Sequence, residues 1–386
     1  MGQKRNTTNT RQMVGNYAFS AVLPRSIDTK GMREAVAAGG KYISWGRDNQ
    51  YPALLRDLYL DVATLETIIN GTVDYVLGNE IKCNIPHFET EINKRGDTIA
   101  DLIERLACDY MIYGGFAFAV VRNLKGEVAE LEYQDMETVR SNEDNTIFYI
   151  AKSWRTNARV KSVKIPAFGA DDENARSLVF YKGAKSRGVY PVPTWNVKAA
   201  TIEQQITDYH LSNLNNGFSA ARIFHFHNGE PDEDTKAKIE RDIEDKFCGS
   251  HNAGRCLINY TDGKEYDLDV QTLEDDNLDK KYEGTRKWSQ QMLYTSFRAI
   301  PCLFGLMTEN NGFSREEFLQ AFELYNQTVV LPIQKIITNT FDKVFKTKNS
   351  VEITPFELRV SKNISDGNGT ATNKRESNKN ASPDIK

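Results

Sequence analysis

The amino-acid sequence predicts an α+β fold, and three observations lead to this prediction. In the first half, apolar residues at helical spacing give way to short runs of β-forming residues on either side of turn sequences. In the second half, two long helical patterns enclose a short strand–helix–strand pattern. Apolar residues make up 40% and aromatic residues 10% of the 386 residues, which is enough to form a core.

The composition argues against several classes of protein. With 49 basic and 53 acidic residues the formal net charge is −4, so the chain lacks the excess positive charge of a general nucleic-acid-binding protein. No window approaches the apolar length of a membrane span, and the N-terminus lacks the apolar core of a secretory signal. The five cysteines form no disulfide framework, and we expect synthesis in a reducing, cytoplasmic environment.

Two helices are expected at the start of the folded part. Residues 1–45 have little periodicity, so we expect a flexible N-terminal arm there. From Pro52 the apolar residues keep helical spacing until Gly78 ends the run. A second helix begins near Ile99 and is closed by Gly114.

Strand signals follow these helices. Segments 116–122 and 128–134 flank Asn123-Leu124-Lys125-Gly126, which is a hairpin signal. Residues 46–193 should therefore form one α+β unit. Further strand patterns lie at 139–140, 146–154 and 177–181.

The second half begins with a helix and a small β-α-β unit. Thr194 follows Pro191-Val192-Pro193 and is a suitable N-cap for a helix through about Asn215. The β-α-β unit consists of a strand at 221–227, a helix at 234–248 and a returning strand at 256–260.

Two long helical patterns complete the part expected to be ordered. The first covers roughly residues 274–300, and the second covers 314–345 and opens with Ser314-Arg315-Glu316-Glu317, which has the form of a capping box. Pro332 predicts a kink near Thr328, because proline lacks a backbone N–H and its ring meets the carbonyl four residues earlier. A short strand is expected before residue 360, and the polar residues 361–386 should be disordered.

Two patterns contain the residue types of a metal site. Pro231-Asp232 with Glu244-Asp245-Lys246 matches the letters of a metal-dependent nuclease, but the second group lies in a helical pattern. We expect a solvated acidic helix there. The histidines and cysteines at 225, 227, 248, 251 and 256 include zinc-ligand types, although their spacing fits no closed zinc site, and we expect structural roles. Sequence motifs of ATPases, dinucleotide-binding proteins and hydrolases are absent.

Acidic residues concentrate in the β-α-β region and the start of the next helix. Between residues 230 and 283 there are 17 Asp or Glu residues against 8 Lys or Arg residues. Such a run is usually a solvated surface. It would also keep a polyanion from adhering, because phosphates would find few cations there. The two interpretations are compatible.

Six short segments occur in a distinctive order along these elements. They lie at 113–118 with 126–128, 189–195, 214–218, 249–255, 299–305 and 331–333. In this order they closely resemble the portal proteins of tailed bacteriophages, and the resemblance covers about residues 50–347. Cys302 stands where that family usually has a second proline, and little chain follows Val360 that could form the family's crown.

The resemblance implies a portal fold. Residues 46–193 with 314–360 would form the wing, 194–220 and 266–300 the two stem helices, 221–265 the clip, and 301–313 a tunnel loop. Copies would form a ring, expected to be a dodecamer, at one capsid vertex of the virion after assembly in the host cytoplasm. This ring would be the channel for double-stranded DNA during packaging and ejection.

The resemblance also implies partners. These would be further copies of the chain, the major capsid protein, the large terminase, head-completion or adaptor proteins, and DNA bound without sequence preference. It implies no enzymatic activity, no cofactor, no metal and no membrane. Two other functions remain as alternatives: a metal-dependent nuclease or other DNA-processing enzyme, and another head–tail adaptor ring component.

Three sets of site residues follow from the resemblance. The tunnel loop would include Leu303, Phe304, Leu306, Met307, Thr308, Glu309, Asn310 and Asn311. The channel-lining stem would include Glu274, Asp275, Asp276, Asp279, Lys280 and Glu283. The clip would meet the terminase or adaptor through Asp232, Glu233, Asp234, Lys238, Arg241 and Asp245. Apolar side chains would let the tunnel loops pack on one another without gripping phosphate, as arginines would.

Overall fold

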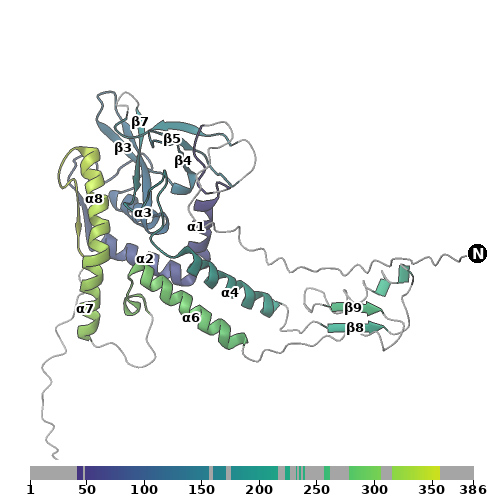
Figure 1. Cartoon of the computed structure of the whole chain (residues 1–386). Coiled ribbons are helices and arrows are strands. Elements are labelled where there is room, and N and C mark those ends of the chain that lie inside the picture. The colour runs from purple at the N-terminus through teal and green to yellow at the C-terminus, as the bar shows by residue number, and fades with distance from the viewer. Residues whose placement is uncertain are drawn as a thin grey trace, which may run out of the picture.

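The structure is a computed structural model that describes residues 41–46, 48–155, 160–170, 175–215, 222–226, 256–260, 278–305 and 315–356, with residues 232, 234, 235, 238 and 239. It consists of a body of helices and antiparallel sheets and a pair of helices that extends from this body (Figure 1). No helix among the described residues is long and apolar enough to cross a membrane.

Two helices, α1 (Tyr51–Asp61) and α2 (Ala63–Leu77), occupy the stretch for which the sequence predicts a single helix. Val62 lies between them with an extended backbone (φ −104°, ψ 101°) and a buried side chain. The spacing of apolar residues shows which residues face the core. This spacing continues through Val62, so it does not show that the helix is interrupted there. Gly78 ends α2, as predicted.

Helix α3 (Ile99–Tyr113) confirms the second predicted helix. Thr98 and Asp101 form a capping box at its N-terminus, and Gly114 has a left-handed backbone (φ 79°) at its C-terminus. The position of Gly114 is also crowded, because an added Cβ would lie 2.0 Å from the carbonyl oxygen of Val192. Both the turn and the close approach therefore require glycine here.

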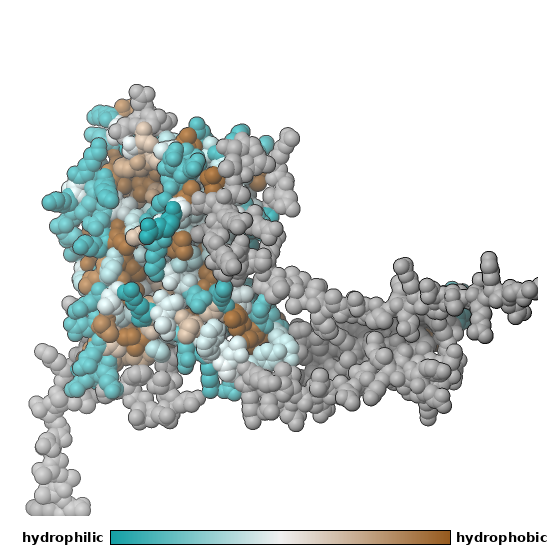
Figure 2. All heavy atoms as spheres, in the orientation of Figure 1, coloured by the Kyte–Doolittle hydropathy of each residue, from teal (hydrophilic) through white to brown (hydrophobic). Residues whose placement is uncertain are grey.

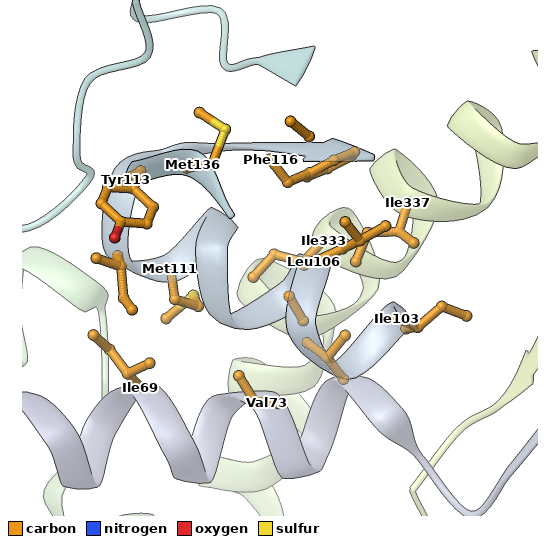
Figure 3. Close-up of a cluster of buried hydrophobic side chains, with 14 of the residues drawn as sticks. Ile69, Val73, Ile103, Leu106, Met111, Tyr113, Phe116, Met136, Ile333 and Ile337 are labelled. Carbon is orange, nitrogen blue, oxygen red and sulfur yellow. The ribbon is translucent and has the colours of Figure 1, made fainter. Parts of the chain in front are cut away.

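The core of the body lies where α2, α3 and helix α8 (Leu331–Phe345) meet. Figure 3 shows the side chains that fill it, including Ile69 and Val73 of α2, Leu106 and Met111 of α3, and Ile333 and Ile337 of α8. Each of these six is at most 6% exposed. Burial of one such side chain stabilises a fold by about 1.5–3 kcal/mol, so this junction fixes the three helices relative to one another.

Two three-stranded antiparallel sheets complete the body. The first has the order β3-β2-β7, with β2 Gly115–Arg122, β3 Val128–Tyr133 and β7 Arg176–Lys182. The second has the order β4-β5-β6, with β4 Val139–Ser141, β5 Ile147–Ile150 and β6 Val163–Pro166. A bridge from Ala167 to Leu178 links the two sheets. The predicted hairpin around Asn123 is confirmed, whereas β6, with one buried residue, has no signal in the sequence.

A buried arginine holds the segment before α1 against β4. Arg140 is 1% exposed and donates hydrogen bonds to the backbone carbonyl and side-chain oxygen of Asn49. Its guanidinium lies 5.9 Å from the ring centroid of Trp45 and 5.1 Å from that of Trp154, both of which are buried. Burial lowers the pKa of Arg140 to about 10. Tyr42 contacts the rings of Tyr149 and Trp154, and Ile43 pairs with Ser141. Residues 42–45, for which the sequence predicts a flexible arm, therefore pack on the body.

The last two helices of the body form one interrupted rod (Figure 1). Helix α7 (Arg315–Tyr325) is joined to α8 by a π-helical turn (Asn326–Val330), which contains Thr328. At the predicted kink position the structure has a widened turn, and the two helices continue as one rod. A wider turn relieves the contact between the proline ring and the carbonyl four residues earlier.

A separate two-stranded antiparallel sheet lies next to α8. It pairs β1 (Glu80–Cys83), which follows α2, with β10 (Val351–Thr354), which follows α8. Cys83 lies opposite Val351, and both side chains are buried. The strand expected before residue 360 is present, whereas β1 was not predicted.

Candidate channel-forming and docking sites

Helices α4 (Val197–Asn215) and α6 (Leu278–Phe297) pack side by side and extend away from the body (Figure 1). The rings of Tyr209 and Tyr282 lie between them with centroids 4.6 Å apart. Both helices were predicted, but the cap of α4 is Asn196 rather than Thr194. The side-chain oxygen of Asn196 accepts the backbone N–H of Ala199.

The burial of this helix pair falls with distance from the body. Near the body, the side chains of Val197, Ala200, Leu293 and Phe297 are buried. Farther out, all residues of α6 from 283 to 288 are exposed, which is more than one full turn. The exposed side chains include Leu211, at 56%, and Trp288, at 47%. Packing within the described chain therefore does little to stabilise the far half of the pair.

A buried polar cluster fixes the near half of the pair to α2. Thr64 of α2 donates a hydrogen bond of 2.6 Å to one carboxylate oxygen of Glu203 on α4. The side-chain nitrogen of Gln290 on α6 lies 3.3 Å from the hydroxyl of Thr64 and 3.5 Å from the same oxygen of Glu203. These three side chains tie three helices together, so the direction of the pair is set by the body.

The start of the predicted tunnel loop is part of the core. Leu303 and Phe304 lie in a short 3₁₀ helix (Pro301–Phe304) directly after α6, and each is 8% exposed. The ring of Phe304 contacts those of Tyr75, Tyr294 and Tyr325 at centroid distances of 6.2, 6.3 and 5.5 Å. The expectation that these two side chains project into a channel is therefore wrong, because both are buried within the same chain.

A glycine in α2 makes room for this packing. An added Cβ at Gly71 would lie 2.9 Å from Cδ1 of Phe304, which is closer than carbon atoms normally approach. Glycine inside a helix costs about 0.5–1 kcal/mol relative to alanine. The packing of Phe304 against Gly71 offsets that cost. Because Phe304 is held in the core, the loop after Gly305 starts from a fixed position. The remaining tunnel-loop residues, Leu306, Met307, Thr308, Glu309, Asn310 and Asn311, lie outside the described residues.

Few of the predicted stem residues can be placed. Glu283 is exposed on α6 and forms an ion pair of 3.0 Å with Lys287, one turn away. Asp279 and Lys280 lie within α6, but their side chains are outside the described part of the structure, as are Glu274, Asp275 and Asp276 altogether. The helix α6 itself is not acidic, since it carries four basic residues and two acidic ones. An acidic lining would therefore depend on the residues before α6.

The predicted clip is described in part. Strands β8 (Arg222–Phe226) and β9 (Cys256–Tyr260) form a parallel pair, as a β-α-β unit requires, and they lie beyond the far ends of the helix pair (Figure 1). Asp232, Asp234 and Lys238 are exposed, whereas Glu233, Arg241 and Asp245 lie outside the described residues. A hydrogen bond from Thr235 lowers the pKa of Asp232.

The metal-site alternatives gain no support from the residues that can be placed. Glu244, Lys246, His227, Cys248 and His251 lie outside the described residues. Among the described residues, no group of three or more His, Cys, Asp or Glu side chains is arranged to hold a metal ion.

One titratable site in the body has no counterpart in the sequence predictions. Asp109 of α3 is 4% exposed, and its carboxylate accepts the hydroxyl of Tyr133 at 3.1–3.2 Å. Burial, with a smaller effect of nearby Asp135, raises the pKa of Asp109 well above its usual range. Asp109 lies three residues after Leu106 and seven after Leu102, so its signal in the sequence is an acid on the apolar face of a helix.

Comparisons with known proteins agree with this geometry. No family model matches the chain. A curated relative, described as a probable portal protein of Haemophilus phage HP1 (strain HP1c1), is 23% identical over 265 residues, which cover 67% of this chain and 73% of the relative.

Solved structures share the fold at lower sequence identity. A chain from the virion of a native gene transfer agent (GTA) particle superimposes with a TM-score of 0.52 and 14% identity, covering 82% of this chain and 86% of that one. A chain from the neck of the native GTA particle, computed with C12 symmetry, gives a TM-score of 0.51 and 14% identity, with coverage of 80% and 84%. The resemblance to phage portal proteins that the sequence predicts is therefore confirmed by a curated relative, and the fold is similar to that of chains in solved GTA particle structures.

Proposed function

We propose that this chain is a portal subunit, and that copies of it form a ring around a channel for double-stranded DNA. The observation that carries the proposal is the helix pair α4 and α6, whose near half is fixed to the body and whose far half leaves residues 283–288 of α6 exposed over more than one full turn. Neighbouring copies of the same pair would cover this surface. The similarity to a probable phage portal protein supports the proposal, and so does the likeness to chains from GTA particle necks computed with C6 and C12 symmetry.

The apolar side chains on the pair indicate how the copies would meet. Among the described side chains of the pair, Trp288 of α6 and Leu211 of α4 are the large apolar ones that are exposed. Tryptophan is enriched at interfaces, where it supplies much contact area at low conformational cost. In the proposed ring, Trp288 of each copy packs against the helix pair of the next copy.

The body would be the wing of the ring, and β8 and β9 would belong to the clip. The clip would meet the large terminase during packaging and head-completion or adaptor proteins afterwards, while the wing would face the major capsid protein. Residues 306–313 remain the proposed tunnel loop, and Leu303 and Phe304 act as its anchor inside the body rather than as part of its tip. The role is passive, since DNA would be driven by a separate ATPase.

The ring is tested with single substitutions on exposed residues. Purified full-length protein should form rings with a central hole in negative-stain images and a multimeric mass in solution. Trp288→Glu should leave a folded subunit that no longer forms rings, because burying an unpaired carboxylate where the indole would pack at a helix–helix contact has a large cost. Leu211→Glu should weaken assembly in the same direction.

The matched control is Leu124→Glu at the tip of the β2–β3 hairpin, where the leucine is fully exposed and far along the chain from the pair. This variant should assemble normally. A wild-type protein that stays monomeric at high concentration contradicts the ring. Rings that persist in Trp288→Glu contradict the proposed interface while leaving the ring intact.

The acidic lining is tested separately. Replacing Glu274, Asp275, Asp276 and Asp279 by lysine should slow DNA packaging, because lysines would bind phosphates and release counterions. Unchanged packaging rates in a reconstituted reaction would remove this part of the proposal.

A further inference from the structure

A groove lies between α8 and β10 on the surface of the body. It has a volume of about 600 Å³ and is lined on the helix side by Leu331, Gln334, Lys335 and Thr338. On the strand side it is lined by all residues from 351 to 355. Successive side chains of a strand point to opposite faces, so a wall that includes every residue is formed by the backbone edge of the strand.

This edge of β10 has no partner strand in the described residues. The sheet contains only β1 and β10, and the backbone N–H of Asn84 donates to the carbonyl of Ser350. In an antiparallel ladder, successive residues direct their backbone groups to opposite sides. Residues 350, 352 and 354 therefore face β1, and the N–H and C=O groups of Val351 and Ile353 face the groove. Such an edge is a ready template for one more strand.

One exposed apolar side chain lines the groove, and another lies on the preceding helix, α7. Leu331, which lines the groove, is 39% exposed, and Leu324 on α7 is 58% exposed. Figure 2 shows hydrophobic residues at the surface over α7, among hydrophilic ones. A strand in the groove would place side chains beside Leu331, which lines it.

The charge of this region differs from that of the whole chain. Residues 331–356 contain the lysines Lys335, Lys343, Lys346 and Lys348 and only two acidic residues, Asp342 and Glu352. All four lysines are exposed. The backbone N–H and the hydroxyl of Ser350 donate hydrogen bonds of 2.9 and 2.7 Å to the carboxylate of Asp342. The groove itself is lined by Lys335 and Glu352, whose charges balance, and the excess of positive charge comes from Lys343 near the end of α8 and from Lys346 and Lys348 in the turn before β10.

We propose that this groove docks an extended segment of a partner protein that carries acidic side chains. The segment would add to β10 as a third strand, pair its backbone with Val351 and Ile353, and place carboxylates near Lys335 and the lysines of the turn before β10. Backbone pairing supplies affinity in this mode of recognition, and alternate side chains supply selectivity. The proposal does not depend on ring formation, since the groove lies within one chain.

The test uses fluorescein-labelled synthetic peptides and the full-length protein. The probe is an eight-residue peptide of alternating valine and glutamate, and its matched control alternates valine and lysine. Fluorescence anisotropy should show the acidic peptide binding about tenfold or more tightly than the basic one. Lys335→Glu should lower the affinity for the acidic peptide about five- to tenfold, because the substitution replaces an attraction between charges by a repulsion. Lys125→Glu, in the distant hairpin tip, should leave binding unchanged.

A second probe tests strand addition without altering the protein. Methylation of alternate backbone nitrogens of the acidic peptide removes donors but keeps its charge, and this peptide should not bind detectably. Equal binding of the methylated peptide, or equal binding of the acidic and basic peptides, overturns the proposal, as does no binding of the acidic peptide.

Hydrogen exchange identifies other occupants of the groove. The amides of Val351 and Ile353 should exchange rapidly in the isolated chain and become protected when the acidic peptide is added. Protection of these amides in the isolated protein before any peptide is added would mean that this chain or a second copy already fills the groove, and it would overturn the proposal.

Discussion

The body and the helix pair of this chain are built in opposite ways. In the body, helices from both ends of the described chain enclose side chains that are almost fully buried, and two sheets cover them. In the far half of the pair, a full turn of α6 is exposed and Trp288 and Leu211 face outward. The body thus carries the contacts that determine its own fold, whereas the described chain supplies few contacts to the far half of the pair, which neighbouring copies would cover in the proposed ring.

The largest expected difference between the two regions concerns a core aromatic residue. Phe118 of β2 is fully buried and stacks on Phe341 of α8 with ring centroids 5.4 Å apart. Phe118→Ala should lower the free energy of unfolding by about 3–5 kcal/mol, because it removes contacts and leaves a cavity. Urea unfolding followed by circular dichroism measures this loss. Trp288→Ala, measured on unassembled subunits, should change the same quantity by less than about 1 kcal/mol. Equal losses in the two variants would remove the contrast.

Glycine-to-alanine substitutions should have opposite signs in the two regions. In the body, Gly71→Ala should destabilise by about 1–2 kcal/mol, because the new Cβ crowds Phe304 and the loss exceeds the gain in helix propensity. In the pair, an added Cβ at Gly284 meets nothing within 4 Å. Gly284→Ala should therefore stabilise α6 by up to about 1 kcal/mol. Thermal unfolding of both variants checks the signs, and a stabilising Gly71→Ala would show that Phe304 is not tightly seated.

Asp109 should make the stability of the body depend on pH. Its pKa is raised in the folded state, so above the unfolded value of about 3.9 the folded chain holds a proton that the unfolded chain has lost. Stability should then fall as pH rises toward the folded pKa, by up to about 1.4 kcal/mol per pH unit.

Asp109→Asn tests this assignment. The variant should show a weaker dependence of the free energy of unfolding on pH and should be more stable than wild type at neutral pH. Urea unfolding of both proteins at pH 5, 6 and 7 measures this difference. An unchanged slope in this variant would assign the pH dependence to other groups.

The smallest effect is expected at the ion pair of α6. Glu283 and Lys287 are both largely exposed, and such pairs contribute about 0.3–0.5 kcal/mol. Glu283→Gln should therefore change the stability of the isolated subunit within experimental error. A measurable loss would indicate that the far half of the pair is held more firmly than its exposure suggests.

Local chemistry explains which elements could be predicted from sequence. The hairpin around Asn123, the C-cap at Gly114 and the interruption before Pro332 all follow from residues within a few positions of one another. Strand β1 gave no such signal, because it has four residues and its partner β10 lies near the other end of the described chain. The break at Val62 was missed because the apolar spacing continues through it.

The site was predictable only in outline. The order of the elements was enough to reveal the resemblance to portal proteins, which a curated relative supports. The placing of Leu303 and Phe304 was wrong, because an apolar run between two helices is compatible with an exposed loop and with a core segment. Only the ring contacts of Tyr75, Tyr294 and Tyr325 decide between them. Asp109 was overlooked for the related reason that its burial depends on strands distant in sequence.

The pairing of β1 with β10 has a consequence for how the chain is made. In the sequence, the helix pair and the strands β8 and β9 lie between the early and late parts of the body. Helix α8 and strand β10 therefore leave the ribosome only after this whole segment has been synthesised. Until then, α2 and α3 lack the helix that covers them, and their apolar faces stay open to the solvent and to chaperones. A subunit truncated in its last third should consequently be recognised as defective before it can join an assembly, because the early part of the body cannot close without the late one.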